Sequence, residues 1–228
     1  MSTPNKVGKR TEKRMRQERA QRRQRLFTIL AVSIAAVIVA VLLIWPYIRP
    51  AYQGAMERPQ PVEKSMGDPN APVKVEEFSD FQCPFCRQFH TEMAEDFVQK
   101  YVATGQVYYT YVPFSFLGPE SVRAAEAAYC AMDQGKFWEY HDIIFANQAG
   151  ENAGNFNDNR LKDFASQLKL DTAAFNSCLD NNTYQEQVAA DVEYGRGKGI
   201  NATPSFIVND GTPVDMNGLE AAVEAALQ

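Results

Sequence analysis

Residues 73–112 read VKVEEFSDFQCPFCRQFHTEMAEDFVQKYVATGQVYYTYV and hold two runs of β-forming residues on either side of a helical pattern. The first run covers 73–78, and the second covers 107–112 and stops at Pro113. Between them, apolar residues recur at helical spacing over about 83–103. A strand, a helix and a strand in this order usually place the two strands side by side and parallel. The stretch therefore predicts the β–α–β core of an α/β domain.

Cys83 and Cys86 form a C-x-x-C motif at the point where the first predicted strand gives way to the helix. A thiol at a helix N-terminus faces free N–H groups and the positive end of the helix dipole, which favour the thiolate. The second thiol lies one turn further on, close enough to form a disulfide with the first. Pro84 falls at the first helical position, where the N–H that it lacks would have no partner. The motif in this context predicts a redox-active pair of cysteines.

A metal site is the competing interpretation of the same two cysteines. Zinc needs four ligands, or three ligands and a water molecule. His90, four residues after Cys86, would complete a Cys/Cys/His cluster for zinc or copper, but the other two cysteines form no second C-x-x-C. We therefore favour redox chemistry, and expect neither a bound metal nor another cofactor.

Glu77 lies in the first predicted strand, six residues before Cys83. An acid in a mostly apolar strand can simply face water. It can also be a partly buried carboxylate beneath the active site, with a pKa raised by desolvation, that exchanges a proton with Cys86 when the disulfide opens. The spacing alone leaves both interpretations open.

The second half of the chain is predicted to be helical until a final β-hairpin. The hairpin is expected at 205–215, with Asp210-Gly211 as its two-residue turn. The Thr203-Pro204 bond precedes it, and because only about 5–6% of X-Pro bonds are cis, the residues by themselves favour trans. Apolar residues at three- and four-residue spacing predict helices near 119–133, 136–147, 159–168, 171–180, 183–197 and 217–227.

Cys130 and Cys178 lie on two of these predicted helices, each among apolar neighbours. In a reducing compartment they would be two buried thiols, whereas outside the cytoplasm a disulfide is favoured. The two cysteines are 48 positions apart. Closing a ring of this size with a disulfide stabilises a fold by about 4 kcal/mol on the loop-entropy model.

The first 45 residues differ in composition from the rest. Residues 1–25 hold ten Lys and Arg against two Glu, and 26–45 form an uncharged run of 20 residues. At about 1.5 Å per residue this run spans about 30 Å, the thickness of a bilayer core, so it predicts a transmembrane anchor. The basic residues before it place the N-terminus in the cytoplasm and the remainder outside. A cleaved signal peptide is the alternative, although its apolar core is usually shorter.

A linker at 46–72 carries six of the chain's twelve prolines and joins the predicted anchor to a domain at 73–228. The residues after 25 hold 13 basic and 26 acidic side chains, the remainder of the chain's 23 and 28. A domain as acidic as this repels phosphate, so nucleic-acid binding is not expected.

Three motifs carry a resemblance to a known family: DFQCPFC at 80–86, KFWEYH at 136–141 and GINATPSF at 199–206. Together they resemble the DsbA-like thiol:disulfide oxidoreductases, above all the membrane-anchored, single-domain members. The likeness covers about 65–228. It implies a thioredoxin-like fold (βαβ, then ββα) that is interrupted by a helical insertion at about 113–198.

The resemblance also implies roles for single residues. Pro204 would be cis and would lie beside the first cysteine of the C-x-x-C motif. The backbone of Thr203 would pair with an extended substrate peptide. Glu77 would be the family's buried acid. A second disulfide occurs in the helical insertion of some relatives, in keeping with a Cys130–Cys178 bond.

Phe85 departs from the family pattern, because the strongest oxidants carry His between the proline, here Pro84, and the second cysteine. A phenyl ring gives neither a hydrogen bond nor a positive charge to a Cys83 thiolate. The reduced state should therefore be stabilised less, and we expect a milder oxidant.

These expectations describe an extracytoplasmic, membrane-tethered enzyme that introduces disulfides into exported proteins with free thiols through Cys83 and Cys86. A quinone-linked membrane protein, DsbB-like or VKOR-like by resemblance, would reoxidise it. The alternatives are a disulfide reductase or isomerase of the same fold, and a copper or zinc protein that uses Cys83, Cys86 and His90. We expect a single-pass protein of the cell membrane with its catalytic domain on the periplasmic or cell-surface side.

Overall fold

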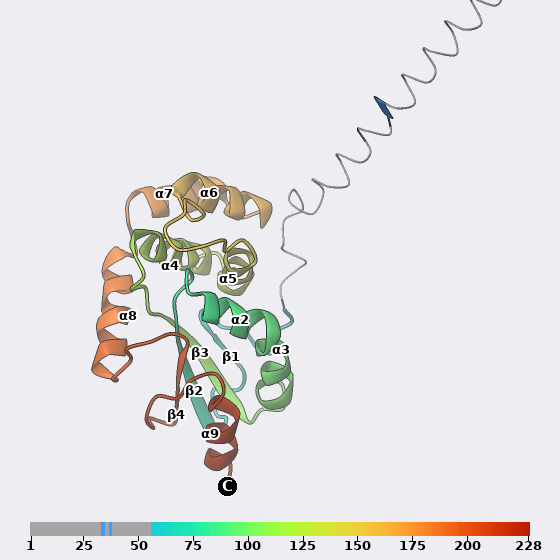
Figure 1. Ribbon diagram of the computed structural model, residues 1–228, viewed down its shortest axis with the longest axis vertical. Helices are drawn as coiled ribbons and strands as arrows, with labels where there is room; N and C mark the ends of the chain where they lie inside the picture. The colour runs from blue at the N-terminus through green and yellow to red at the C-terminus, as the bar shows by residue number, and fades with distance from the viewer. Residues whose placement is uncertain (1–32, 35–36, 38–55) are drawn as a thin grey trace, which may run out of the picture. The chain divides into compact units, whose positions relative to one another are not determined.

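A four-stranded sheet lies at the centre of the domain and consists of β1 (Ser65–Met66), β2 (Val73–Ser79), β3 (Val107–Pro113) and β4 (Ser205–Val208) (Figure 1). The strand order is β1-β3-β2-β4. β2 and β3 are parallel, with Val73 opposite Val107, and this confirms the predicted strand–helix–strand unit. β1 joins β3 and β4 joins β2, both antiparallel. β1 was not predicted, because two residues are too few to show a period.

The structure is a computed structural model that describes residues 33, 34, 37 and 56–228. The chain divides into two units, Met1–Pro50 and Ala51–Gln228, and the second holds all of the described residues from Met56 onward. The predicted basic tail, most of the predicted anchor at 26–45 and the first part of the linker lie outside the described residues. Among the residues that are described, no helix is long and apolar enough to cross a bilayer.

The two faces of the sheet pack against different helices. Along β2, Val73 and Val75 alternate with Glu76 and Phe78, and successive side chains of a strand point to opposite faces. The face that holds Val73 and Val75 packs against α2 (Pro84–Glu92), α3 (Ala94–Phe97), the π-helical turn η1 (Val98–Val102) and α9 (Leu219–Ala226). The face that holds Phe78 packs against α8 (Gln185–Gly197).

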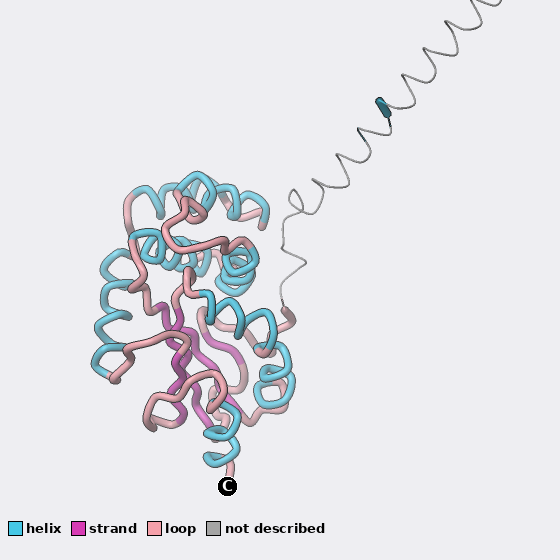
Figure 2. The backbone as a smooth tube through the Cα atoms, viewed as in Figure 1, coloured by secondary structure: helices cyan, strands magenta, loops and turns pink. Residues whose placement is uncertain are grey.

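A helical insertion separates β3 from β4. Its other helices lie together at one end of the sheet, beyond the start of α2, and α8 runs back along the sheet toward β4 (Figures 1 and 2). The predicted helices of this region are confirmed to within about two residues at each end. They are α4 (Pro119–Met132), α5 (Phe137–Ala146), α6 (Asp158–Gln167) and α7 (Thr172–Asp180).

The prediction of one continuous helix over 83–103 is wrong, because the helix breaks at Met93. Met93 has φ −128° and ψ −32°, and the chain continues as α3 and then as η1. The break turns the following residues toward the sheet, so that Ala94 and Phe97 are buried while Met93 stays partly exposed. Neither Pro nor Gly marks this position, so the sequence gives no local signal for it.

The predicted hairpin turn is shifted by one residue. Asn209 and Asp210 occupy the two central positions with φ of 46° and 60°, and the Gly211 N–H closes the turn on the Val208 carbonyl at 2.9 Å. Asn209 is held by Lys74 of β2, which donates its backbone N–H to the Asn209 side chain at 2.7 Å. Beyond the turn the predicted second strand is reduced to a single bridge between Phe206 and Val214.

Candidate active site

The two cysteines of the C-x-x-C motif lie where β2 leads into α2. Cys83 is the N-cap residue, with an extended backbone at φ −70° and ψ 122°, and Pro84 is the first residue of the helix. Neither thiol is in a disulfide. Cys83 is 5% exposed and Cys86, inside the first turn, is 0% exposed. A reacting sulfur from another molecule can therefore reach Cys83 but not Cys86.

The two thiols are set to opposite protonation states. Hydrogen bonding from the Cys86 thiol lowers the pKa of Cys83 to about 6; burial acts in the opposite direction, and the N–H groups of Phe85 and Cys86 support the lowering. Burial and the adjacent Cys83 sulfur raise the pKa of Cys86 well above its usual value. Near neutral pH the reduced site thus holds a nucleophilic thiolate at Cys83 beside a thiol at Cys86.

The loop before β4 meets the first cysteine. The Thr203-Pro204 peptide bond is cis, which differs from the base-rate expectation and agrees with the resemblance. The carbonyl oxygen of Thr203 accepts a hydrogen bond from the Cys83 thiol at 3.3 Å. Hydrogen bonding from the Thr203 side chain also lowers the pKa of Cys83. Residues that are far apart in the sequence, Cys83, Thr203 and Pro204, therefore come together at one site.

Glu77 faces the interior, not water. Its side chain is 0% exposed; Oε1 lies 2.9 Å from Nε2 of His90, and Oε2 accepts a hydrogen bond from the Tyr109 hydroxyl. Burial by itself would raise the pKa of Glu77, but the charge and hydrogen bond of His90 and the hydrogen bond of Tyr109 hold it below the usual value. The expected rise of this pKa is therefore wrong, because desolvation is outweighed by the partners.

His90 has a different role from the one that its spacing suggested. It lies on α2 with Nε2 directed at the Glu77 carboxylate, and its ring stacks on Phe145 of α5 at a centroid distance of 4.5 Å. Within residues 33, 34, 37 and 56–228 no cluster of three or more His, Cys, Asp or Glu side chains is arranged to hold a metal ion. The imidazole is thus a partner of the buried acid.

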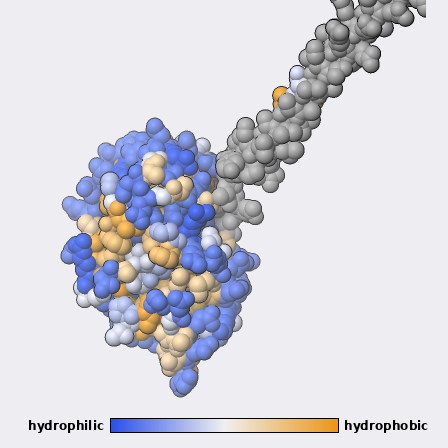
Figure 3. Space-filling view, in the orientation of Figure 1, coloured by the Kyte–Doolittle hydropathy of each residue, from blue (hydrophilic) through white to orange (hydrophobic). Residues whose placement is uncertain are grey.

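Two large apolar side chains near the C-x-x-C loop are exposed. Phe85 is 60% exposed at the start of α2, and Phe116, in the loop after β3, is 42% exposed. Figure 3 shows apolar surface over the middle of the face that is turned to the viewer, with hydrophilic surface on its outer sides. Phe85 therefore offers an apolar contact to a partner but no hydrogen bond to the thiolate.

Two polar residues that the sequence did not single out hold the cysteine loop in place. Gln148, in the loop after α5, donates hydrogen bonds to the carbonyl oxygens of Phe81 at 2.7 Å and of Cys83 at 3.0 Å. The buried carboxylate of Asp80 accepts from the N–H of Phe116 at 2.9 Å. Both tie the C-x-x-C loop to segments distant in the sequence, so no local pattern could have revealed them.

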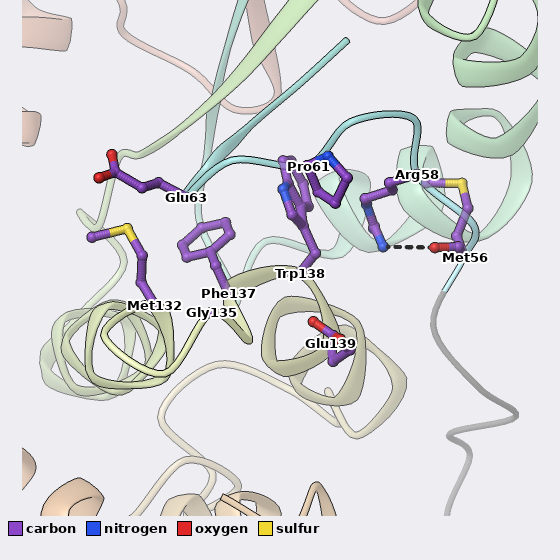
Figure 4. Close-up of a pocket in the computed structure, with 9 residues that line it drawn as sticks. All are labelled: Met56, Arg58, Pro61, Glu63, Met132, Gly135, Phe137, Trp138 and Glu139. Carbon is purple, nitrogen blue, oxygen red and sulfur yellow. Dashed lines mark hydrogen bonds between the residues drawn. The ribbon is translucent and has the colours of Figure 1, made fainter.

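The beginning of the described domain is fastened to α5. Arg58 donates two hydrogen bonds to the Asp142 carboxylate, at 2.8 and 2.6 Å, and its guanidinium carbon lies 4.5 Å from the centroid of the Trp138 ring. Figure 4 shows Met56, Arg58 and Pro61 facing Trp138 along a cavity of about 220 Å³, which no cysteine lines. This cavity is therefore separate from the redox site.

The remaining two cysteines join two helices of the insertion. Cys130 of α4 and Cys178 of α7 form a disulfide, with an S–S distance of 2.00 Å and a Cα–Cα distance of 5.9 Å. The bond closes a ring over a sequence separation of 48. It leaves Cys83 and Cys86 as the two free thiols of residues 56–228.

The chain is similar to known proteins of disulfide chemistry. The family model described as thioredoxin matches residues 60–227. Disulfide bond formation protein D of Bacillus subtilis is 31% identical, over 66% of this chain and 68% of that protein. The crystal structure of oxidised BdbD from Bacillus subtilis matches with a TM-score of 0.67 and 26% identity, over 76% of this chain and 99% of that one.

A further relative has a different overall function. The Na⁺/H⁺ antiporter NhaA 3 of Salinispora tropica is 33% identical over 70% of this chain, and the chain spans only about a quarter (24%) of its length. The similarity thus concerns one segment of that protein. Together with the C-x-x-C geometry, the family match over most of the described domain and the relationship to disulfide bond formation protein D lead to one conclusion: this chain belongs to the DsbA-like thiol:disulfide oxidoreductases, which are built on the thioredoxin fold.

Proposed function

We propose that this chain introduces disulfides into proteins outside the cytoplasm by means of Cys83 and Cys86. The observation that carries the proposal is the position of Cys83 as the N-cap residue of α2, where hydrogen bonding from Cys86 lowers its pKa to about 6. A stabilised thiolate stabilises the reduced enzyme, and an enzyme whose reduced form is stabilised passes its disulfide on readily. The same placement at the helix start makes Cys83 the better leaving group of the two sulfurs.

The reaction consists of two thiol–disulfide exchanges. A substrate thiolate attacks Cys83 of the oxidised enzyme, a mixed disulfide forms, and Cys86 leaves as a thiolate that takes up a proton. A second substrate thiolate then attacks the substrate sulfur of the mixed disulfide and releases Cys83. The substrate loses two electrons and gains a disulfide; the enzyme ends as a Cys83 thiolate and a Cys86 thiol. The substrate releases two protons, of which Cys86 keeps one.

Glu77 is the acid that exchanges this proton with Cys86. It is wholly buried in β2, in the strand that leads to the C-x-x-C motif, and its partners favour the ionised form. An ionised carboxylate accepts the Cys86 proton when the disulfide is re-formed, and returns it when the disulfide opens.

Substrates bind as extended segments beside the Thr203-Pro204 bond. The Thr203 carbonyl already accepts a hydrogen bond from the Cys83 thiol at 3.3 Å, so backbone placed there would lie next to the reacting sulfur. Phe85, 60% exposed, adds apolar contact area on the same side. Recognition by backbone and apolar surface suits an enzyme that acts on many exported proteins with free thiols.

The N-terminal sequence supports a membrane anchor, and the resemblance to the DsbA-like family supports a membrane protein as the reoxidising partner. Residues 26–45 hold the protein in the membrane with the basic residues 1–25 in the cytoplasm, and 46–72 connect the anchor to the catalytic domain at 73–228. A quinone-linked membrane protein of the DsbB or VKOR type reoxidises the cysteines. This reaction suits a tethered enzyme, since both proteins share one membrane.

A measured reduction potential tests the direction of the reaction. Because Phe85 gives the thiolate no hydrogen bond, equilibration of the full-length chain with glutathione should give a value between those of thioredoxin, about −270 mV, and DsbA, about −120 mV. In cells, the Cys83–Cys86 pair should be mainly oxidised. Acid trapping followed by thiol alkylation measures the oxidised fraction. A potential below that of thioredoxin, with the pair mainly reduced in cells, would instead identify a reductase.

A further inference from the structure

Glu77 cannot exchange protons with water directly, because none of its side chain is exposed. Each carboxylate oxygen has one partner: the Tyr109 hydroxyl on Oε2 and the His90 ring on Oε1. A proton that Glu77 takes from Cys86 must therefore leave through one of these neighbours before the next turnover. The geometry allows the candidates to be compared.

The two tyrosines beside Glu77 cannot carry this proton. Burial, with the negative charge of Glu77, raises the pKa of both Tyr109 and Tyr111 well above the usual value. Both side chains are buried in β3. Near neutral pH both hydroxyls stay protonated, so neither gives a proton up; the Tyr109 hydroxyl donates its hydrogen bond to the carboxylate and holds it in place.

His90 is the neighbour that reaches an opening. Its side chain is 8% exposed and, with Arg87 and Thr91 of the same helix, it lines a cavity of about 260 Å³. A cavity of this size holds several water molecules, each of which occupies about 30 Å³ in the liquid. The apolar gap beneath the ring, toward Phe97, has no room for water. Imidazole is also the side chain best suited to exchange protons near neutral pH.

The groups on α5 support the ring of His90 without competing for the proton. His141 is wholly buried with its ring centroid 4.4 Å from that of His90, and burial lowers its pKa to about 4. It stays neutral near pH 7, so it does not repel a positive charge on His90. Asp142 hydrogen-bonds Nδ1 of His141 at 2.8 Å and is in turn neutralised by Arg58. Arg87 is the remaining charged side chain that lines the same cavity.

We propose that His90 carries the proton between Glu77 and the water of the cavity beside α2 and α5. The inference rests on the proposed function, in which Glu77 exchanges a proton with Cys86. When the disulfide is re-formed from a mixed disulfide between Cys83 and an oxidant, Cys86 gives its proton to Glu77 and His90 passes it to the cavity. The Cys86 thiolate then attacks Cys83, breaks the mixed disulfide and expels the thiolate of the oxidant. Opening of the disulfide moves one proton in the reverse direction. No electrons pass through His90, which acts on the reaction through Glu77.

The closing of a glutathione mixed disulfide isolates the relevant step. Oxidised glutathione reacts with the Cys83 thiolate of the full-length reduced chain, and Cys86 must lose its proton before it can expel the glutathione. Acid quenching followed by mass spectrometry measures how fast the mixed disulfide decays. We expect H90Q, which keeps a hydrogen-bond donor near Glu77, to slow the decay at pH 7 by about tenfold or more.

A second variant distinguishes proton transfer from packing. H90A leaves a space of about the size of imidazole that opens to the cavity, so added imidazole should restore most of the decay rate lost in H90A and should leave the wild-type rate unchanged. Q88A, which alters an exposed residue of the same helix, should close its mixed disulfide at the wild-type rate. Unchanged decay in H90Q would overturn the proposal. So would slow decay in H90A that imidazole does not restore.

The same assay distinguishes the role of His90 from the proposed role of Glu77. If E77Q slows the decay and H90Q does not, Glu77 exchanges the proton by another route and only the role of His90 fails. If neither variant slows the decay, the role of Glu77 fails together with that of His90. The oxidising function, which the reduction potential tests, is affected by neither result.

Discussion

The side-chain amide of Gln148 donates a hydrogen bond to the carbonyl oxygen of Cys83, at 3.0 Å, and so links the helical insertion directly to the reactive cysteine. The same amide nitrogen also serves the Phe81 carbonyl at 2.7 Å. Both acceptors belong to the turn between β2 and α2, where the Cys83 carbonyl also accepts the helical N–H of Arg87 at 3.1 Å and the Phe81 carbonyl relies on Gln148. The insertion thus contributes to the position of Cys83 as well as covering the end of the sheet.

Replacement of Gln148 by Leu should therefore loosen the C-x-x-C turn. The variant leaves the buried Phe81 carbonyl without a partner, at about 1–3 kcal/mol for a buried group left unsatisfied, and leaves the Cys83 carbonyl with the Arg87 N–H alone. We expect Q148L to lower the free energy of unfolding by about 2 kcal/mol and to change the rate at which Cys83 reacts with a thiol reagent. Urea denaturation and alkylation kinetics measure the two effects, and Q167L, which alters an exposed glutamine of the same insertion, is the control.

We expect Cys83 to be the sulfur that joins the substrate, because it is 5% exposed against 0% for Cys86 and has the lowered pKa. C86A should therefore accumulate substrate proteins as mixed disulfides on Cys83, which non-reducing gels and mass mapping of the linked peptides detect. C83A should trap none. Trapping by C83A alone would mean that Cys86 is the attacking sulfur, in conflict with its complete burial.

Replacement of Glu77 by Gln tests whether the buried acid exchanges a proton, because Gln has nearly the same size and shape but no ionisable group. The amide can still accept the Tyr109 hydroxyl but cannot take a proton from Cys86, so closure of the Cys83–glutathione mixed disulfide should slow by about tenfold or more near neutral pH. The slowing should shrink as pH rises toward the raised pKa of Cys86, because hydroxide then removes the proton. Equal rates for E77Q and wild type over pH 6–8 would leave Glu77 with a structural role alone.

His141 makes the stability of the domain depend on pH. Burial lowers its pKa to about 4, whereas a histidine of the unfolded chain titrates near 6.5. Between these values the unfolded state binds a proton that the native state does not, so stability is lost as pH falls through that window. The loss is about 3 kcal/mol, at about 1.4 kcal/mol per pKa unit.

Urea denaturation at pH 7, 6, 5 and 4 measures this dependence. H141Q should flatten the curve above about pH 4.5, even if the variant is less stable at every pH. The carboxylates whose pKa values are lowered in the fold, Glu77 and Asp142, lose their contribution only at lower pH. An H141Q curve with the wild-type slope between pH 5 and 7 would contradict the assignment.

Local patterns in the sequence predicted the helices and strands well, but not the contacts between residues that are far apart in the sequence. The period of the apolar residues was enough for six helices and for the parallel pair of strands, since both depend on which face is buried. The C-x-x-C motif was enough for the redox pair because the strand before it and the helix after it fix its position. The sequence identified Glu77 as a candidate but could not show whether its side chain faces water or the interior, since a single acid in a strand fits either face of the sheet.

The missing parts of the site all depend on contacts between distant segments. His90 was considered only as a ligand beside Cys86, because its partner Glu77 is reached through the packing of α2 on the sheet. Gln148 lies 65 residues after Cys83, with one strand and four α-helices between them. The shifted hairpin turn has a similar cause: Lys74, on another strand, holds Asn209 and so selects which two residues turn. Such choices are made by tertiary contacts that no short window contains.

The ion pair between Arg58 and Asp142 has a practical consequence for the design of an expression fragment. A fragment cut at residue 60, where the family match begins, would remove Arg58 and leave the partly buried carboxylate of Asp142 without its counter-ion. Because the Asp142 side chain is 16% exposed, this loss costs less than the ~3–5 kcal/mol of a fully buried pair, but even about 2 kcal/mol is a sizeable part of the stability of a domain. A soluble fragment of this protein must therefore begin before Met56, whose N–H also binds Asp142, at 3.0 Å.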